Sequence, residues 1–220
     1  MCNRYLSPDA AAIERLWAVR PGTAWTAAAV YPRAPGPFIR RVAAERTARE
    51  LVVGQWALIP VFADSRRLAY STNNARFEEI TTKASYKGPW ARGQRSIIPA
   101  ESFDEPCWET GRNVWWRFVR TDGEPWGLAG LYNTWLDRST GELIESYTML
   151  TVNADHHPLM KRMHKPDPAY GPEAQDKRSV VVIERDAVEA WLTGTPAEAA
   201  ALVAPPAMAV VSGAPLKAAR

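Results

Sequence analysis

The first two residues could give this chain a nucleophile that no internal position can supply. Met1 precedes Cys2, and bacteria usually remove the initiator methionine before so small a residue. The α-amine and the thiol of Cys2 would then lie two carbons apart, as a 1,2-aminothiol. Because an α-amine has a pKa of about 8, about a tenth of it is neutral at pH 7, whereas lysine, with a pKa of about 10.4, is almost wholly charged.

This aminothiol predicts a reaction with an aldehyde. The neutral amine would form a Schiff base, and the tethered thiol would close a five-membered thiazolidine. We therefore interpret the chain as a scaffold that brings an aldehyde to Cys2, and we expect the sulfur of Cys2 to be within reach of solvent. The alternative is that Cys2 merely follows the start codon and has no chemical role.

A polar segment in the first half of the chain could assist such a reaction. Asn73 and Asn74 lie in a polar break before Arg76, where a side-chain amide could orient the amine. Paired asparagines in a loop also serve as turn residues. The sequence leaves both interpretations open.

A group of carboxylates could move protons. Glu105 follows an apolar strand predicted over 95–99, in a segment that also holds Glu101 and Asp104. Such a group is often solvated, but a carboxylate at a strand end beside tryptophans can be desolvated and act as a general acid or base.

Imidazole chemistry is confined to one stretch, because His156, His157 and His164 are the only histidines. His157 and His164 lie seven residues apart, so they could share a helix face, and a histidine at a helix end can also be a cap. No HExxH or CxxC spacing is present, and we expect no metal or other cofactor. Cys107, the second of two cysteines, is interpreted as a small core residue.

Hydrophobic spacing and turn residues predict the elements that position these groups. Ser7 is the predicted N-cap of a first helix, with Pro8 at its first position and apolar residues at helical spacing up to Trp17. Further helices are predicted before Trp90 and over 157–163, 186–192 and 196–203. Strands are predicted over 38–43, 50–58, 95–99, 113–119, 126–135, 146–152, 179–183 and 208–211.

Strands in the middle of the chain and helices near its ends indicate an α+β fold. We expect one domain over residues 1–220, with a largely antiparallel, curved or barrel-like β-sheet flanked by short helices. The first two strands should form a hairpin with a charged turn. Polar loops are predicted over 60–70, with Phe62 exposed, and over 165–175.

Composition favours an anionic partner. The net charge is +3, and 21 of the 27 basic residues are arginine, whose planar fork suits phosphate. Ten tryptophans leave some aromatic surface for stacking. No apolar run is long enough to span a bilayer, and no signal peptide opens the chain. We therefore expect a cytoplasmic protein without a membrane partner.

An ordered set of motifs resembles the SRAP family, the SOS response-associated peptidase domain that shields abasic sites in DNA. The matching segments are Met1-Cys2-Asn3-Arg4-Tyr5, 56–60, Asn74-Ala75-Arg76 with Glu78, 100–105, and His164 before an apolar strand. The resemblance implies a barrel-like fold and autoproteolytic removal of Met1. It also implies a monomer, nucleoid-associated during DNA damage, whose Cys2 forms a thiazolidine with an abasic site in single-stranded DNA.

The resemblance also assigns roles by position. Cys2 would be the nucleophile, Asn74 would hold its amine and the sugar, Glu105 would shuttle protons, and His164 would assist ring opening. His157 is the rival of His164, since a loop over 165–177 separates His164 from the next strand. The implied DNA-binding residues are Arg4, Arg76, Arg178, Thr151 and Phe62.

Two other functions remain open at this point. The chain could be a non-covalent binder of single-stranded or damaged DNA, with an unreactive N-terminus. It could also be a cysteine peptidase of the N-terminal-nucleophile type that acts on proteins. The leading hypothesis is a lyase-type or thiol-peptidase-like enzyme that crosslinks itself to the lesion.

Overall fold

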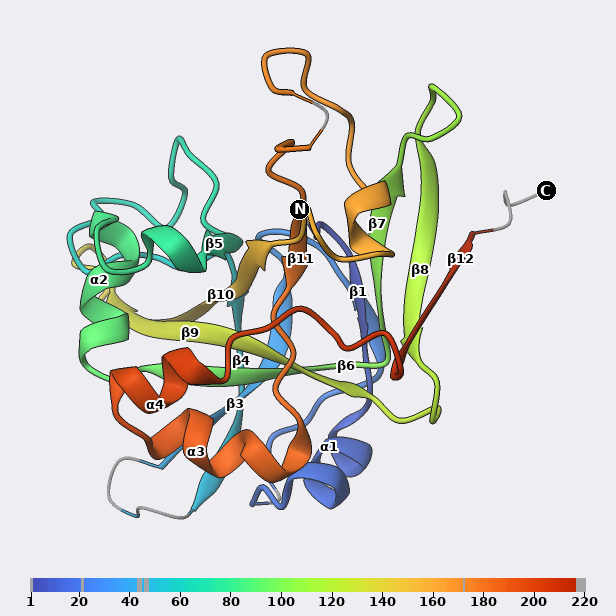
Figure 1. The fold of residues 1–220 in the computed structure, drawn as a ribbon. Coiled ribbons are helices and arrows are strands. Elements are labelled where there is room, and N and C mark those ends of the chain that lie inside the picture. The colour runs from blue at the N-terminus through green and yellow to red at the C-terminus, as the bar shows by residue number, and fades with distance from the viewer. Residues whose placement is uncertain (1, 21, 43–44, 46–47, 172, 217–220) are drawn as a thin grey trace.

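The fold is built around a closed barrel of five strands (Figure 1). The computed structural model describes residues 2–20, 22–42, 45, 48–171 and 173–216. The strands follow one another around the barrel as β10, β4, β3, β6 and β9, and β9 pairs again with β10. The β4–β10 pair is parallel and the other barrel pairs are antiparallel. These strands are β3 (Pro35–Arg41), β4 (Arg49–Trp56), β6 (Arg95–Ala100), β9 (Trp126–Leu136) and β10 (Leu143–Asn153).

A second, antiparallel sheet stands beside the barrel and contains the N-terminal strand (Figure 1). Its order is β12, β8, β7, β1 and β2, so β1 lies between β7 and β2. Because β1 and β7 are adjacent, the residues before β1 run alongside β7. The strands are β1 (Tyr5–Ser7), β2 (Ala28–Val30), β7 (Ser102–Cys107), β8 (Val114–Arg120) and β12 (Val211–Pro215).

Two short strands flank the C-terminal half of β10. β5 (Asn74–Arg76) pairs with it in parallel, and β11 (Arg178–Val180) pairs with it antiparallel on the other side. Thr151 of β10 lies opposite Arg76 on one side and Val180 on the other. Residues from three distant parts of the chain therefore meet where β10 ends.

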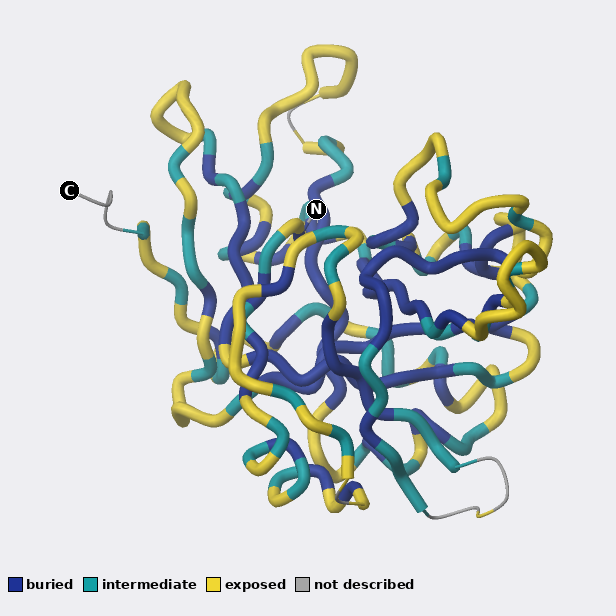
Figure 2. Tube along the Cα trace, turned by 180° about the vertical axis from the view of Figure 1, so that it is seen from behind, coloured by how far each residue is buried: buried dark blue, intermediate teal, exposed yellow. Residues whose placement is uncertain are grey.

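Buried residues gather along the barrel strands in the interior of the protein (Figure 2). The two larger clusters of buried apolar side chains stabilise this arrangement. One joins the barrel to the second sheet and includes Cys2, Phe103, Trp126 and Tyr147. The other lies beneath the helices and includes Trp191. The helices are α1 (Ala10–Trp17), α2 (Ala84–Ala91), α3 (Val188–Thr193) and α4 (Pro196–Ala201), with single 3-10 turns at η1 (Phe77–Glu79), η2 (Met160–Arg162) and η3 (Arg185–Ala187).

The α+β class and the barrel-like, largely antiparallel sheet are confirmed, as is the antiparallel pairing of the first two predicted strands. Most of the turn predicted between those two strands lies outside the described residues. No helix in the described part of the chain is long and apolar enough to cross a bilayer. One domain over residues 1–220 stays a prediction.

The predicted start of the first helix is wrong. Asp9, not Ser7, is the N-cap, and its carboxylate accepts a hydrogen bond of 2.8 Å from the backbone N–H of Ala12. Ser7 is buried and pairs with Ala28 in the β1–β2 ladder. Ser7 therefore belongs to the sheet, and Asp9 is the next residue whose side chain can cap the helix.

Three other predicted elements also differ from the structure. The 102–107 segment is a strand, not a connection: it pairs with β1 and β8, and its two carboxylates are buried instead of solvated. The helix predicted over 157–163 is a single 3-10 turn. The last strand begins at Val211, where the strand predicted over 208–211 ends. A strand of buried polar residues carries no hydrophobic signal in the sequence.

Gly36 allows a close approach within the barrel. A Cβ atom there would clash with the hydroxyl oxygens of Tyr147 and Tyr5, the latter at 2.6 Å. These hydroxyl groups belong to fully buried rings that are not free to move. We expect Gly36→Ala to lower the free energy of unfolding by about 1–3 kcal/mol, as overpacking does, measured by urea denaturation. Gly171→Ala, where the space is open, should change it by less than about 0.5 kcal/mol.

Candidate functional site

The structure brings together the four residues predicted to do the chemistry. The N-terminal residues run along β7, where the backbone N–H of Asp104 donates to the carbonyl of Arg4 at 3.0 Å. Asn74, at the start of β5, donates from Nδ2 to the carbonyl of Cys2 at 2.7 Å. On β7, Glu105 Oε2 lies 2.8 Å from His164 Nε2. Cys2 therefore lies between an amide and a carboxylate–imidazole pair.

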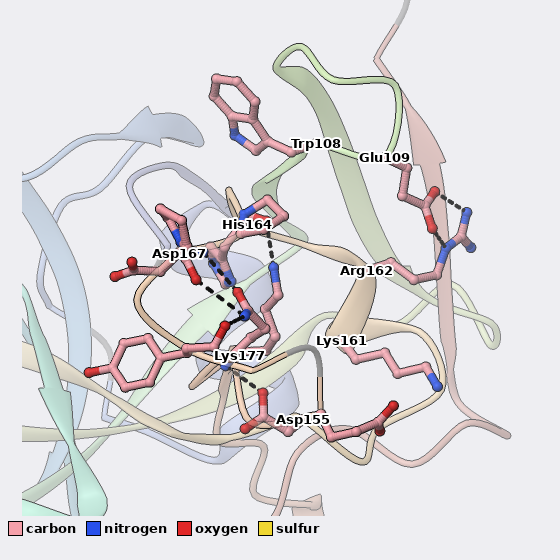
Figure 3. A pocket seen from close by; sticks show the side chains of 13 residues that line it. Trp108, Glu109, Asp155, Lys161, Arg162, His164, Asp167 and Lys177 are labelled. Atoms are coloured by element: carbon pink, nitrogen blue, oxygen red, sulfur yellow. Dashed lines mark hydrogen bonds and ion pairs between the residues drawn. The ribbon is translucent and has the colours of Figure 1, made fainter.

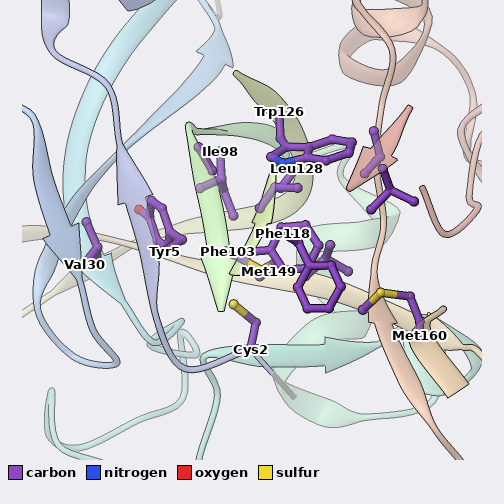
Figure 4. Close-up of a cluster of buried hydrophobic side chains, with 14 of the residues drawn as sticks. Cys2, Tyr5, Val30, Ile98, Phe103, Phe118, Trp126, Leu128, Met149 and Met160 are labelled. Atoms are coloured by element: carbon purple, nitrogen blue, oxygen red, sulfur yellow. The ribbon is translucent and has the colours of Figure 1, made fainter. Parts of the chain in front are cut away.

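The expectation that the Cys2 sulfur is within reach of solvent is contradicted for the chain that retains Met1. Cys2 is fully buried, and its thiol donates to the carbonyl of Arg4 at 3.3 Å. Figure 4 shows the sulfur among apolar side chains that include Phe103 and Met149. Burial, reinforced by the negative charge of Glu105, raises the pKa of the thiol far above its usual range. In this form the thiol is protonated and enclosed.

A second amide lies at the same carbonyl. Asn73 is buried, and its Nδ2 lies 3.4 Å from the Cys2 carbonyl and 3.2 Å from Oδ1 of Asn3. Asn73 and Asn74 thus form part of the site instead of a surface turn. In this form Asn74 contacts the carbonyl of Cys2, and its proposed hold on the amine stays a prediction.

The buried Glu105 and the partly buried His164 form an acid–base pair. Burial alone would raise the pKa of Glu105, but electrostatic and hydrogen-bonding interactions, those with His164 among them, lower it below its usual value. The carboxylate is therefore ionised, and since it can only accept, Nε2 of His164 carries the proton of this contact. Such a pair can both remove and deliver protons at a neighbouring atom.

His157, the predicted rival, has a structural role. Its Nε2 lies 2.8 Å from the carbonyl of Pro206, and its Nδ1 accepts from the backbone N–H groups of Leu159 and Met160 at 3.2 and 3.0 Å. Both ring nitrogens therefore hold backbone groups in place. His164 is the histidine that the fold brings to Glu105.

The first predicted DNA-binding arginine belongs to a charge cluster around one buried carboxylate. Arg4 lies 3.1 Å from the carboxylate of Asp104 on β7. Arg117 of β8 contacts the same carboxylate with two nitrogens, at 2.9 and 3.1 Å. Two guanidinium groups therefore share one carboxylate. Nothing in the sequence pattern indicated Arg117, which is brought there only by the β7–β8 register.

The other two predicted arginines meet at the carboxylate of Asp176. Its Oδ2 lies 3.0 Å from Arg76, and its Oδ1 lies 3.0 Å from Arg178. Arg178 also contacts Glu78 at 2.6 Å and donates to the Thr151 carbonyl at 3.0 Å. A carboxylate thus bridges two guanidinium groups from β5 and β11, as a phosphate could.

Two predicted DNA-binding residues differ in their exposure. Thr151 is buried, and its hydroxyl donates to the carbonyl of Ala75 at 3.4 Å. Its backbone carbonyl accepts from Arg178, and its role in DNA binding stays a prediction. Phe62 is exposed, as predicted, with 54% of its surface accessible in the loop after β4.

A cavity of about 600 Å³ opens beside His164 (Figure 3). The segment over 165–175, predicted as a polar surface loop, makes much of its wall. The other wall comes from the end of β7 and from η2. Its lining includes Trp108, Lys161, Arg162, His164, Asp167, Tyr170 and Lys177.

The closed barrel with an antiparallel sheet beside it defines the class of fold that carries these residues. The family model for SOS response associated peptidase (SRAP) matches residues 1–218, and the chain belongs to this family. A crystal structure of a protein from Bordetella bronchiseptica shares 33% identity, with a TM-score of 0.85 over 98% of this chain and 100% of that one.

Two named relatives are similar over part of their length. Abasic site processing protein HMCES from Xenopus tropicalis is 29% identical over 68% of this chain and 47% of its own. Abasic site processing protein YoaM from Bacillus subtilis is 28% identical over 74% of this chain and 65% of its own. The chain thus spans about half to two thirds of the length of these relatives.

Proposed function

We propose that this protein processes abasic sites by capturing them covalently. The lesion would be in single-stranded DNA, and the product would be a thiazolidine between its aldehyde and Cys2 of the mature chain. The observation that carries the proposal is the convergence of Cys2, Asn74 and the Glu105–His164 pair. The names of the relatives support the lesion, and the excess of arginine supports the polyanion.

The reaction balances as a condensation. The ring-opened sugar presents its C1′ aldehyde, the amine of Cys2 adds to that carbon, and loss of one water gives an imine. The sulfur then adds to the imine carbon and its proton passes to the nitrogen. Glu105 would take the proton from the attacking amine, and His164 would protonate the sugar ring oxygen as the ring opens.

The buried state of Cys2 makes removal of Met1 part of the proposal. While Met1 is attached, the nitrogen of Cys2 is an amide without nucleophilic character, and the thiol is enclosed. Hydrolysis of the peptide bond before Cys2, which we assign to the chain itself, frees the amine. The structure with Met1 is thus the inactive precursor, and intact mass spectrometry of the purified protein distinguishes the two forms.

A denaturing gel tests the proposal against its alternatives. Mature protein is incubated with a single-stranded oligonucleotide that contains one abasic site, with a tetrahydrofuran analogue that lacks the aldehyde as control. We expect a protein–DNA band that survives denaturation with the abasic strand, and no such band with the tetrahydrofuran analogue. Binding to both strands without such a band would support a non-covalent binder, and cleavage of added peptides would support a peptidase.

The carboxylate that bridges two arginines predicts a gain of affinity. Asp176→Asn removes a negative charge from the place where we expect a DNA phosphate between Arg76 and Arg178. Since an ion pair near the surface contributes about 0.2–1 kcal/mol, two such contacts predict an about two- to thirtyfold lower Kd for undamaged single-stranded DNA. Fluorescence anisotropy at several salt concentrations should also give a steeper salt dependence. Asp167→Asn, in the same loop, is the control, and an unchanged Kd for Asp176→Asn would contradict the prediction.

A further inference from the structure

His164 has a backbone conformation that requires support. Its φ is +64°, in the left-handed region that residues other than glycine rarely adopt. Residues in this region persist where the surrounding structure holds them, often at functional sites. On one side, the backbone N–H of His164 donates to the carbonyl of Pro106 on β7 at 2.6 Å.

Lys177 provides the support on the other side. Its Nζ donates to the carbonyl of His164 at 2.7 Å, a contact visible beside the cavity in Figure 3. The chain leaves the site at His164 and returns at Lys177, so this hydrogen bond closes the base of the intervening loop. The backbone of His164 is thus held between β7 and the residue that precedes β11.

Lys177 is itself fixed in place. Its backbone N–H donates to Oδ1 of Asp155 at 2.8 Å, and its carbonyl accepts from the N–H of Ala154 at 2.7 Å. The residue is buried, and burial lowers the pKa of its ammonium group. An ammonium partly withdrawn from water is stabilised by hydrogen bonding, and the carbonyl of His164 is such a partner.

We propose that Lys177 is a positioning residue that holds His164 against Glu105, and so controls the steps in which His164 moves a proton. The inference rests on the proposed function, because those steps belong to capture of the abasic site. It does not require Lys177 to touch DNA. A substitution of Lys177 leaves Glu105 and His164 in the chain, but it removes the hydrogen bond that fixes the backbone of His164 and so orients its imidazole.

The test compares variants of the mature protein in single-turnover crosslinking to an abasic oligonucleotide across pH. Misplacement of a catalytic group by about 1 Å can reduce a rate about a hundredfold. Because the contact of His164 with β7 remains in Lys177→Met, we expect a smaller displacement and a rate about tenfold lower. The substitution should also change the shape of the pH–rate profile. Lys177→Arg, which keeps a charged donor, should restore most of the rate. Lys161→Met removes the same charge from the wall of the same cavity and should stay within twofold of the wild type.

A double-mutant cycle separates positioning from a general structural role. In a His164→Gln background, Lys177→Met should cause no further loss of rate. An equal loss in both backgrounds, or a wild-type rate for Lys177→Met, would overturn the proposal. If Lys177→Met does not fold, Lys177→Gln, one bond shorter and still polar, takes its place in the same cycle.

NMR of the imidazole resonances keeps this test apart from that of the proposed function. Lys177→Met should shift the signals of His164 and leave those of His156 and His157 in place, and Lys161→Met should shift none of them. If wild-type protein forms no adduct with abasic DNA, the proposed function fails. The spectra alone then decide whether Lys177 positions His164. Unmoved His164 signals in the Lys177 variant would then refute its positioning role.

Discussion

Replacing Glu105 by glutamine is expected to slow thiazolidine formation about a hundredfold, at the lower end of the range for general acid–base catalysis. The substitution removes the buried group best placed to accept the proton of the attacking amine. It also replaces the ionised partner of His164 by an amide. Single-turnover crosslinking at neutral pH measures the loss, and circular dichroism establishes that the variant is folded.

The pH dependence of the same residue has a defined sign. Because the folded-state pKa of Glu105 is lowered, its carboxylate stays ionised when the pH falls through the usual glutamate range. Its contribution to stability is present above the unfolded-state pKa and is lost only as the pH falls through the lower folded-state pKa. Urea denaturation from pH 7 downward should therefore show that wild type and Glu105→Gln converge only at acidic pH.

Glu101 offers a matched control for both measurements. It lies in the turn before β7, and its side chain is exposed. Glu101→Gln removes the same charge from nearly the same place in the sequence. We expect its crosslinking rate to stay within twofold of the wild type. An equal loss in the two variants would mean that general negative charge, not the contact with His164, explains the effect.

The fold class followed from features that are local in the sequence. The apolar runs around β4, β6 and β9 predict strands because these strands are buried in the barrel wall, and the helices near the C-terminus follow from their spacing. The sequence does not predict β7, because buried positions of this strand carry polar side chains where a strand normally carries apolar ones. Asp104 and Glu105 are buried and polar, and their partners, Arg117 and His164, lie elsewhere in the chain. No local signal distinguishes such a strand from a solvated loop.

The candidate site was predictable only in part, for a similar reason. Cys2 can be predicted from the sequence alone, because its proposed chemistry depends only on its position directly after the initiator methionine. Its burial depends on packing against β6, β7 and β10, which the N-terminal sequence does not encode. Asp176 and Lys177 lie in a polar stretch that resembles any solvated loop. Their contacts with Arg76 and His164 arise because that loop returns to the end of the barrel.

The loss of the stable adduct in Cys2→Ala should be the largest single effect. With Met1 removed, the alanine variant keeps the α-amine but lacks the sulfur that closes the ring. The imine should still form, because the amine and the Glu105–His164 pair are intact, but water can reverse it. We therefore expect at least a hundredfold less adduct on a denaturing gel, and a band that reappears when borohydride reduces the imine.

Cys107→Ala provides the matched control for this prediction, because Cys107 is the second buried free thiol. Its sulfur lies 3.6 Å from Glu109 and 3.7 Å from the Arg162 carbonyl, so its loss should leave the Cys2 aminothiol intact. A stable, undiminished adduct in Cys2→Ala would rule out the thiazolidine. Loss of the adduct in both variants would point to unfolding instead. Retained adduct in Cys107→Ala together with its loss in Cys2→Ala assigns the covalent bond to the N-terminal sulfur.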